Sequence, residues 1–526
     1  MHYRIRPIAD ALGFNPLAWL RNTRRMQMAV AAFLSTRPAA GCAGPRVLAV
    51  ITPWQGTSVP WYTLVLALLM SARGCRVAFV LDDLPFGDKP WRHAFVLRQL
   101  RAVLRSMQGH HALTVLSTQA VPSDADAAPG PQVHELAHLN TTWHLRGEML
   151  EIGRKAYTDQ CLAQISRADG PIRRMLGHGG HDVLLVPGGV FGTSGVWVAQ
   201  ARAQGLRVCS FDGGGKGVAI FATDGVASQL ADIPSALSHL QATSTPDEYA
   251  FAHAAAAAEM AKRRKGVDTF ASQIADAGSG DARYDGAALV ALNSSWDAAA
   301  LGLHTVFLDN TQWIVETVRH LLQHSSASVI VRQHPAERLP MCRTSDDYRA
   351  LLHCHFGDEP RLHFIAAADS VNSYALLARV ALVVTYTSTI GIEAAALGKP
   401  VVTPSRAYYA GLGFVWQAHD LPQYQALLEA GAAGELQVSA PMRADAYRCY
   451  YLTQCCNWFF SPFSPGTDLN HWSRLELAAL QADANVQLVI TALAEGIPLA
   501  TLNHRQRWAD AALAATAPVA AAMATR

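Results

Sequence analysis

A large excess of either sign of charge is missing from this sequence of 526 residues, which has 43 Lys and Arg against 41 Asp and Glu. The formal net charge of +2 gives no support to a dedicated nucleic-acid binder, which needs a clustered basic face, so no nucleic-acid partner is expected. Hydrophobic residues make up 50% of the chain and charged residues only 16%. A chain of this length and composition can bury a large core, and it predicts two domains with terminal extensions.

Cysteine pairs of the C-x-x-C type are missing, and the nine cysteines are scattered and odd in number. This pattern is typical of buried thiols in a reducing compartment and not of a disulfide framework. The HCH sequence at 353–355 and the adjacent Cys455 and Cys456 lack a second group of ligands at metal-binding spacing. The sequence therefore predicts no metal site.

Long uncharged apolar runs are also missing from the N-terminal segment, where Arg21, Arg24 and Arg25 interrupt the apolar residues. Neither a secretory signal nor a spanning helix fits this segment, so we expect a cytoplasmic protein. A basic amphipathic helix over about residues 17–35 either packs on its own protein or contacts an anionic membrane surface. The first use is the commoner one, and both stay open at this point.

Short apolar segments alternate with helical patterns in the first half of the chain. The expected strands are 46–54, 75–83, 182–189 and 207–215. Such near-continuous apolar strands indicate a parallel sheet that is covered on both faces.

A polar, Gly-rich stretch at 276–286 predicts a hinge, because the alternation of strands and helices restarts after it. The sequence thus predicts an α/β fold of two doubly wound, Rossmann-like domains that face a cleft at the carboxyl ends of their strands. The expected parts are an N-terminal helical extension (1–45), a first Rossmann-like domain (46–275), a second one (286–420) and a C-terminal helical region (421–526).

Five hydroxyl residues, 385–389, stand where an expected strand of the second domain leads into a helix. A helix N-terminus offers unpaired N–H groups and a partial positive charge, so it favours a phosphate. Ser388 and Thr389 would add hydroxyl donors, and Gly391 would let a ligand approach the backbone. Glu393 would cap the helix or bind a ribose hydroxyl. The simpler alternative is an ordinary N-cap, which needs one hydroxyl and not five.

The sequence VIVRQHPAE at 329–337 places Arg332, His334 and Glu337 after another strand of the same domain. Pro335 holds the preceding histidine in an extended conformation, which aims its ring toward the expected cleft. An arginine and a histidine at this place can hold a diphosphate or neutralise the charge of a departing phosphate.

The sequence SFDGGGKG at 210–217 follows a strand of the first domain. Its glycines permit close approach by a ligand, and Asp212 is a candidate general base that removes a proton from an acceptor hydroxyl. A tight turn in which Asp212 bonds its own neighbours is an equal alternative. The motif is not a phosphate-binding P-loop, because no Ser or Thr follows the lysine at the required spacing.

A family resemblance is carried by two longer segments, which include the stretches 329–337 and 385–389. They are NSSWDAAALGLHTVFLDNTQWIVETVRHLLQHSSASVIVRQHPAER and TYTSTIGIEAAALGKPVV. Together they resemble the capsule polysaccharide biosynthesis family, bacterial GT-B glycosyltransferases that include the Kdo transferases. The resemblance spans about 46–420 and is strongest over 290–403. It assigns Asn293, Trp296 and Asp297 to the nucleotide or sugar pocket, and Phe307 and Trp313 also match the pattern.

The His-Pro and Ser-Thr pairs are also similar to the motifs with which bacterial GT-B sialyltransferases hold CMP. This likeness implies that His334, Ser388 and Thr389 contact the donor phosphate and that Asp212 belongs to the base motif. Phe211 stands where that motif has its first Asp. The resemblance further implies a metal-independent enzyme without a cofactor, whose co-substrate is a nucleotide sugar.

The expected function is therefore the transfer of a sugar, Kdo being favoured, from a CMP-linked donor to a glycan or lipid-linked acceptor of a bacterial surface polysaccharide. The expected partners are this donor, this acceptor and, peripherally, the inner membrane or the polysaccharide assembly machinery. A CDP-polyol phosphotransferase of the teichoic-acid type is the nearest alternative. A non-catalytic member that binds the nucleotide or glycan is another, and a UDP-sugar 2-epimerase is less favoured, since it would need further carboxylates.

Overall fold

The computed structural model describes most of the chain in eleven segments (15–36, 43–54, 58–85, 90–110, 113–121, 130–215, 217–265, 282–294, 299–340, 342–466 and 476–524). These segments form two compact units, each of which is described here by itself. Unit 1 comprises Met1–Ala137, Asp159–Asp232 and Asn457–Gln506, and unit 2 comprises His138–Thr158, Ile233–Cys456 and Arg507–Arg526.

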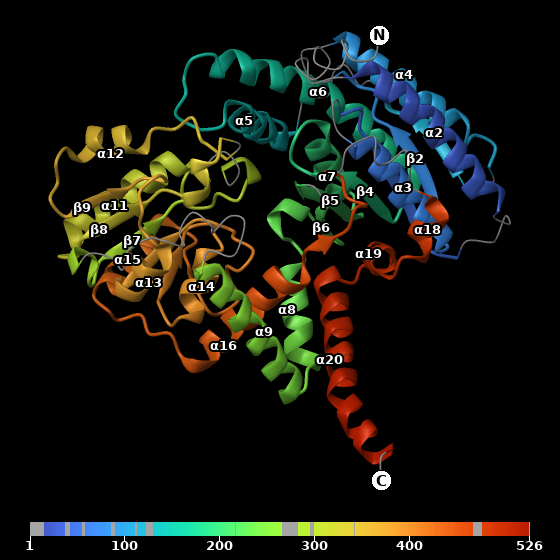
Figure 1. Ribbon diagram of the computed structural model, residues 1–526. Helices are drawn as coiled ribbons and strands as arrows, with labels where there is room; N and C mark the ends of the chain where they lie inside the picture. Colours follow the sequence, from blue (N-terminus) through green and yellow to red (C-terminus); the bar gives the residue numbers. More distant parts are fainter. Residues whose placement is uncertain are drawn as a thin grey trace, which may run out of the picture. The chain divides into compact units, whose positions relative to one another are not determined.

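Unit 1 is built on a seven-stranded sheet with the strand order β13-β6-β5-β4-β1-β2-β3. Strands β2, β4, β5 and β6 of this sheet are labelled in Figure 1. Strands β1 to β5 are parallel, whereas β6 and β13 form an antiparallel edge. The order β3-β2-β1-β4-β5 is that of a Rossmann fold. The strands are β1 (Arg46–Ile51), β2 (Arg76–Leu81), β3 (Leu113–Ser117), β4 (Val183–Pro187), β5 (Arg207–Gly215), β6 (Val218–Ala222) and β13 (Phe459–Phe460).

The crossover helices of unit 1 are held by apolar burial. Every residue of α3 from Val59 to Met70 is buried, because this helix lies between the sheet and α19. Gly74 ends the α3 connection with a φ of 101°, a conformation that side-chain-bearing residues rarely adopt. The helices that belong wholly to this unit are α2 (Pro16–Ser35), α3 (Val59–Ala72), α4 (Pro90–Arg105), α7 (Thr193–Ala203), α18 (Leu477–Ala482) and α19 (Ala484–Glu495).

Unit 2 contains a six-stranded sheet in which every pair is parallel, with the order β12-β11-β10-β7-β8-β9. The chain builds β7, β8 and β9 outward on one side and then returns to add β10, β11 and β12 on the other. The turning point lies between β7 and β10. The strands are β7 (Ala288–Ala291), β8 (Val329–Arg332), β9 (Leu362–Ile365), β10 (Leu382–Thr385), β11 (Val401–Thr403) and β12 (Trp416–Gln417).

Hydrogen bonds as well as apolar contacts fix the helices of unit 2. Trp313 Nε1 of α11 donates to the Tyr424 hydroxyl of α15 at 2.9 Å, and that hydroxyl lies 2.7 Å from Thr317 Oγ1. The helices that belong wholly to this unit are α8 (Ile233–Thr243), α9 (Pro246–Arg264), α11 (Asn310–His324), α12 (Tyr348–Phe356), α13 (Ser373–Arg379), α14 (Ile390–Ala396), α15 (Leu421–Ala432) and α16 (Ala440–Tyr451). Three more helices, α5 (Pro131–Leu145), α6 (Arg154–Gly179) and α20 (Leu499–Ala524), run from one unit into the other.

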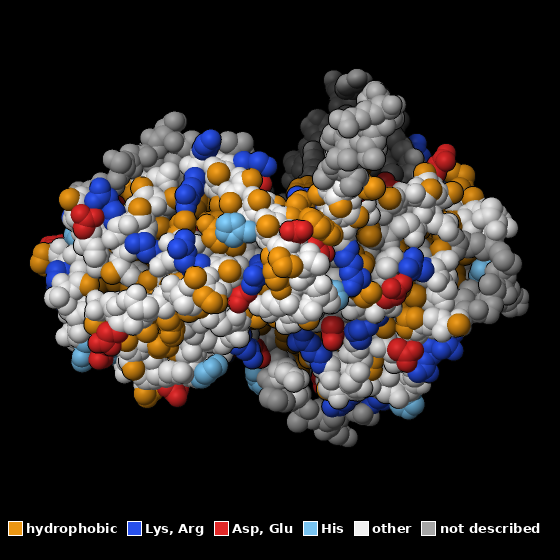
Figure 2. Space-filling view, turned by 90° about the horizontal axis from the view of Figure 1, so that it is seen from below, with side chains coloured by type: hydrophobic (Ala, Val, Ile, Leu, Met, Phe, Trp, Pro, Cys, Tyr) orange, Lys and Arg blue, Asp and Glu red, His pale blue; other side chains and the backbone are white. Residues whose placement is uncertain are grey.

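The predicted α/β class with two Rossmann-like domains is confirmed by these two sheets. Most of the expected hinge, residues 276–281, lies outside the described residues. In the segments that the structure describes, no helix combines the length and apolar character needed to span a membrane. Figure 2 shows a face on which basic and acidic side chains are interspersed, as the small net charge leads one to expect.

The core of unit 2 can be tested with one substitution and its exposed counterpart. Leu382 of β10 is completely buried, whereas Leu308 is 82% exposed. We expect Leu382→Ala to lower the free energy of unfolding by about 2–5 kcal/mol, because it leaves a cavity in the core. Leu308→Ala should change it by less than about 0.5 kcal/mol. Denaturant unfolding of both variants checks this, and equal effects would contradict the packing described.

Candidate donor-binding site

A pocket of about 220 Å³ lies in unit 2, where the carboxyl ends of β7, β8 and β10 meet. Ligands of open α/β sheets bind at such a turning point of the strand order, because the loops diverge there and leave a crevice. The lining comes from five places in the chain: the end of α9, the ends of β7 and β8 with the loops that follow them, the loop after β10 with the start of α14, and the start of α13. It consists of Arg263, Ala291, Leu292, Asn293, Arg332, His334, Pro335, Ser373, Tyr374, Thr387, Ser388, Thr389, Ile390 and Glu393.

Three of the five hydroxyl residues after β10 line this pocket, namely Thr387, Ser388 and Thr389. The other two, Thr385 and Tyr386, are buried beneath them. Thr389 precedes α14 and makes no side-chain cap hydrogen bond, so the ordinary N-cap is not what the structure shows. At the start of α14, the N–H groups of Gly391 and Ile392 already donate to the carbonyl oxygens of Ser388 and Thr389, each at 3.0 Å. The loop therefore contributes its hydroxyl side chains, and not these two N–H groups, to the pocket lining.

Asn293 holds the hydroxyl-bearing loop in place with both atoms of its amide. Its Nδ2 donates to Thr387 Oγ1 at 3.0 Å, and its Oδ1 accepts the Thr387 N–H at 3.1 Å. The end of β7 is thereby tied to the loop after β10, and Asn293 lies in the pocket wall. Its assignment to a nucleotide or sugar pocket stays a prediction. Trp296 and Asp297, assigned to the same pocket, lie outside the described residues.

His334 lies half-buried in the pocket wall and precedes a short 3-10 helix, Pro335–Arg338. Its Nδ1 accepts the N–H of Ala336 at 3.2 Å, which requires that Nδ1 carry no proton. The neutral ring then carries its proton on Nε2, where it can donate to a ligand. Burial, and next the charges of Arg332 and Arg263, lower the pKa of His334 to about 4, so the ring is uncharged at neutral pH.

Arg332 is the last residue of β8 and is 2% exposed. Its guanidinium donates to the carbonyl oxygens of Ala366 and Val371, so it also holds the loop after β9. Burial lowers its pKa to about 10, and it keeps its charge at neutral pH. Arg332 therefore supplies a fixed positive charge to the pocket wall while two of its N–H groups bond the main chain.

The second positive charge of the pocket comes from Arg263, near the end of α9, which was not predicted. Arg263 Nη1 lies 3.0 Å from Oε1 of Glu393, and this buried carboxylate also accepts the Tyr374 hydroxyl at 3.1 Å. Burial raises the pKa of Glu393, whereas Arg263 next to it lowers the pKa. Glu393 thus lines the pocket as an ion-pair partner and is not a helix cap. The basic run of Lys262, Arg263, Arg264 and Lys265 at the end of α9 was the available signal.

Two residues predicted to bind the phosphate lie outside the pocket lining. Glu337 is buried and accepts the Gln333 side-chain amide at 2.7 Å, so it supports the loop from behind. A Cβ on Gly391 would lie 2.7 Å from the Tyr409 hydroxyl, which means that the space in front of this glycine is filled by the tyrosine. The structure therefore gives Gly391 a packing role against Tyr409.

Asp212, the predicted base, lies in unit 1. It is part of β5 and pairs with Ile220 of β6, with a register shift between Asp212 and Gly215. Its Oδ1 accepts the N–H of Gly213 at 2.8 Å. The glycines after Asp212 thus continue a strand into a hairpin, and Asp212 lies next to the irregular part of that hairpin.

The sum of these charges decides what the unit 2 pocket can hold. Its lining has two arginines and one carboxylate, which is already paired with Arg263, plus an uncharged histidine and five hydroxyl residues (Ser373, Tyr374, Thr387, Ser388 and Thr389). This set presents hydrogen-bond donors and net positive charge, which suits a phosphate or diphosphate. In the described part of the chain, no group of three or more His, Cys, Asp or Glu side chains is placed to hold a metal ion.

The family comparison addresses the same stretch of the chain. Residues 238–442 match the family described as "Capsule polysaccharide biosynthesis protein". The predicted resemblance to the capsule polysaccharide biosynthesis family is confirmed over this segment, which contains every lining residue of the pocket. No curated protein matches the chain.

Several solved structures resemble the chain at low identity. A Thermosulfurimonas dismutans KpsC, described as a beta Kdo 2,4 transferase, has 18% identity and a TM-score of 0.31, covering 48% of this chain and 79% of that one. A T. dismutans KpsC described as a beta Kdo 2,7 transferase has 17% identity and a TM-score of 0.29, covering 50% and 79%. A Neisseria meningitidis UDP-GlcNAc 2-epimerase has 12% identity and a TM-score of 0.21, covering 83% and 100%. Likenesses this low carry no argument about activity.

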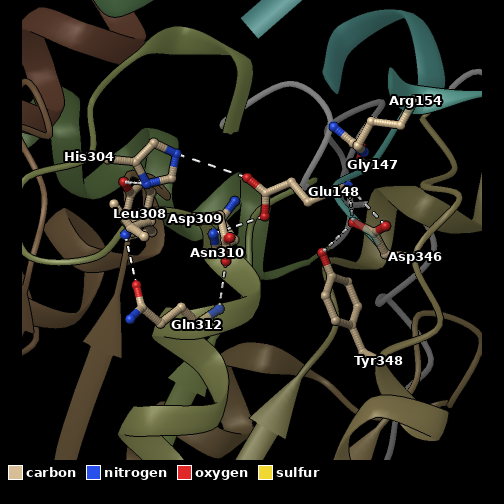
Figure 3. Close-up of polar contacts among 11 residues, drawn as sticks. Gly147, Glu148, Arg154, His304, Leu308, Asp309, Asn310, Gln312, Asp346 and Tyr348 are labelled. Carbon is tan, nitrogen blue, oxygen red and sulfur yellow. Dashed lines mark hydrogen bonds and ion pairs between the residues drawn. The ribbon is translucent and has the colours of Figure 1, made fainter. Parts of the chain in front are cut away.

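A second polar cluster joins the segment 146–149 to the capsule-family segment of unit 2 (Figure 3). The Asp346 carboxylate accepts the N–H groups of Glu148, at 3.0 Å, and Met149, at 2.8 Å. A Cβ on Gly147 would lie 2.4 Å from Asp346 Oδ1, so glycine is needed for this approach. The side chain of Glu148 points to the start of α11, where its Oε2 accepts the Asn310 N–H at 2.9 Å.

The same cluster reaches the base of the pocket through His304. Oε1 of Glu148 lies 4.0 Å from His304 Nε2, and His304 Nδ1 bonds the Tyr386 hydroxyl, one residue before the pocket-lining Thr387. Burial, and next the carboxylates of Asp309 and Asp346, raise the pKa of Glu148 to about 8. Glu148 is therefore mostly protonated at neutral pH.

Glu148 should make stability depend on pH in a defined direction. Its pKa of about 8 in the folded chain exceeds the ordinary 4.5, so its contribution is fully present below about pH 4.5 and is lost as pH rises through 8. Between pH 6 and pH 9 this loss amounts to roughly 3 kcal/mol, and Glu148→Gln removes it. The melting temperature of the variant should fall less between pH 6 and pH 9 than that of the unchanged protein. Glu316→Gln, on the exposed side of α11, is the control, and parallel curves for Glu148→Gln and the unchanged protein would contradict the assignment.

Proposed function

We propose that this protein is a metal-independent GT-B glycosyltransferase of bacterial capsule or surface polysaccharide biosynthesis. It transfers a sugar, Kdo being favoured, from a CMP-linked donor to a glycan or lipid-linked acceptor on the cytoplasmic side. The observation that carries the proposal is the unit 2 pocket, in which Arg263, Arg332 and the Nε2 proton of His334 accompany the hydroxyls of the 387–389 loop. The match of residues 238–442 to the capsule family supports the same reaction class.

The proposed chemistry rests on the phosphate that departs with the nucleotide. As the bond from the sugar to the phosphate oxygen breaks, negative charge grows on that oxygen and is stabilised by donors that are already in place. His334 donates from Nε2 without carrying charge, Arg332 and Arg263 supply positive charge, and Ser388 and Thr389 supply hydroxyl donors. Asp212 is proposed to take the proton from the acceptor hydroxyl.

A phosphate pocket also suits the nearest alternative, a CDP-polyol phosphotransferase, and a non-catalytic nucleotide- or glycan-binding protein. An epimerase is less well supported, because Glu393 is the only carboxylate among the described lining residues and is paired with Arg263. The alternatives differ in the nucleotide that they bind and in turnover, so both are measured.

Nucleotide binding is the first test. A ligand that binds only the folded protein raises its melting temperature, so the unchanged chain is titrated separately with CMP, CDP, UDP and GDP. We expect the largest rise with CMP. The largest rise with CDP would favour polyol-phosphate transfer, UDP or GDP would point to a hexose donor, and no rise with any of them would refute the phosphate pocket.

The proposed donor role of His334 Nε2 can be tested separately from the hydrogen bond that Nδ1 accepts from the Ala336 N–H. His334→Asn keeps a side-chain oxygen that accepts the Ala336 N–H, but it removes the donor at Nε2. We expect His334→Asn to retain its melting temperature within a few degrees and to lose on the order of 100-fold in kcat, since a preorganised donor to developing charge contributes about this much. His334→Ala should lose both the cap and the activity. Full turnover by His334→Asn would contradict the proposed role.

Turnover by the unchanged protein is assayed with and without excess chelator, and equal rates are expected. Asp212→Asn, assayed in parallel, should abolish turnover while it leaves the nucleotide-induced rise in melting temperature unchanged. Nucleotide binding without turnover by the unchanged protein, over a panel of acceptors, would favour the non-catalytic alternative.

A further inference from the structure

Helix α2 presents two faces of different chemistry. One face packs into the core of unit 1 through the buried side chains of Trp19, Met26, Val30 and Phe33. The apolar side of the helix therefore packs on the protein itself, which is the commoner of the two uses expected from the sequence. What remains to be explained is the opposite face, which has no need to be apolar if only water covers it.

The outward face of α2 nevertheless carries large apolar side chains. Leu17 is 49% exposed, Leu20 43% and Met28 65%. Arg21 and Arg24 are exposed on the same side of the helix, because positions 17, 20, 21, 24 and 28 recur at helical spacing. Apolar side chains and arginines thus share one stripe that is about three turns long.

Helix α4 packs beside α2 and repeats this composition. The Gln27 side chain donates to the Ala102 carbonyl at 3.0 Å and ties the two helices together. On α4, Trp91 is 58% exposed, and Arg98 and Arg105 are exposed at helical spacing from it.

Neither helix contains an acidic residue, although α2 has three arginines and α4 has four. Arg101 pairs with Asp83 at 2.8 Å. The exposed arginines of the two helices are Arg21, Arg24, Arg98 and Arg105. This differs from the face in Figure 2, where both signs are interspersed, and from the whole chain, whose net charge is +2. Positive charge is therefore concentrated on this helix pair.

We propose that the outward faces of α2 and α4 dock on an anionic phospholipid bilayer. Leucine, methionine and tryptophan side chains enter the boundary between headgroups and acyl chains, while the arginines between them contact lipid phosphates. A nucleic acid would use the arginines but would leave the apolar side chains in water. A bilayer contacts both the arginines and the apolar side chains, and for this reason it fits the surface better than a nucleic acid does.

This docking complements the absence of a spanning helix among the described residues, because it holds the protein at a surface without crossing it. It does not depend on the proposed glycosyl transfer. Its failure and the failure of the phosphate pocket are therefore seen in separate experiments.

Vesicle co-sedimentation of the full chain tests the proposal. We expect binding to vesicles of phosphatidylglycerol and phosphatidylethanolamine at low salt, little binding to phosphatidylcholine vesicles, and release as the salt concentration rises. The charge variant Arg24→Gln/Arg98→Gln removes one exposed arginine from each helix and should weaken binding roughly tenfold or more. The apolar variant Leu20→Ser/Met28→Ser should increase the fraction that salt releases.

A matched control removes the same charge elsewhere. Lys155→Gln/Arg167→Gln acts on exposed residues of α6, a helix that also carries Asp159 and Asp169, and it should bind vesicles like the unchanged protein. Circular dichroism melting confirms that all variants fold. No binding of the unchanged protein to anionic vesicles, equal binding to phosphatidylcholine, or a charge variant that binds as well as the α6 control would each overturn the proposal.

Discussion

Strand β7 has β8 on one side and β10 on the other, and the candidate site depends on this arrangement. Parallel strands deliver all their carboxyl ends to one edge of a sheet, and a reversal of strand order makes the following loops diverge there. Asn293, His334 and the loop 387–389 come from three such loops and meet for that reason. The hydrogen bonds between Asn293 and Thr387 then set the distance between two of these loops.

The charged and hydrogen-bonding side chains of the pocket are held in place by neighbouring residues. Arg332 is held by two main-chain carbonyls, and Arg263 is held by Glu393, so neither guanidinium has to reorganise when an anion arrives. His334 keeps its place through the Ala336 N–H and contributes a donor without a charge. Groups that are fixed before a ligand binds need no rearrangement during a reaction. They therefore stabilise negative charge that develops in a transition state more than they stabilise the bound starting state.

Charge is organised on a larger scale as well. The chain as a whole is nearly neutral, and yet α2 and α4 carry arginines and no acidic residue. The proposed lipid-linked acceptor would reside in a membrane, so the proposed docking of α2 and α4 on a bilayer would raise the local concentration of that acceptor. The two proposals would then serve one task, although each rests on its own observations.

The sequence by itself determined the fold class, most of the strands and the three loops, after β7, β8 and β10, that line the pocket. Apolar strands, glycines at helix ends and the His-Pro and Ser-Thr segments are local signals, and local signals can be read along the chain. It also indicated an amphipathic helix near residues 17–35. Only the tertiary structure brought Arg263, which precedes Glu393 by 130 residues, to that carboxylate. It likewise placed Glu148 at the start of α11 and filled the space before Gly391 with Tyr409. Contacts of this kind depend on how separate elements pack, and no short stretch of sequence encodes the distance between them.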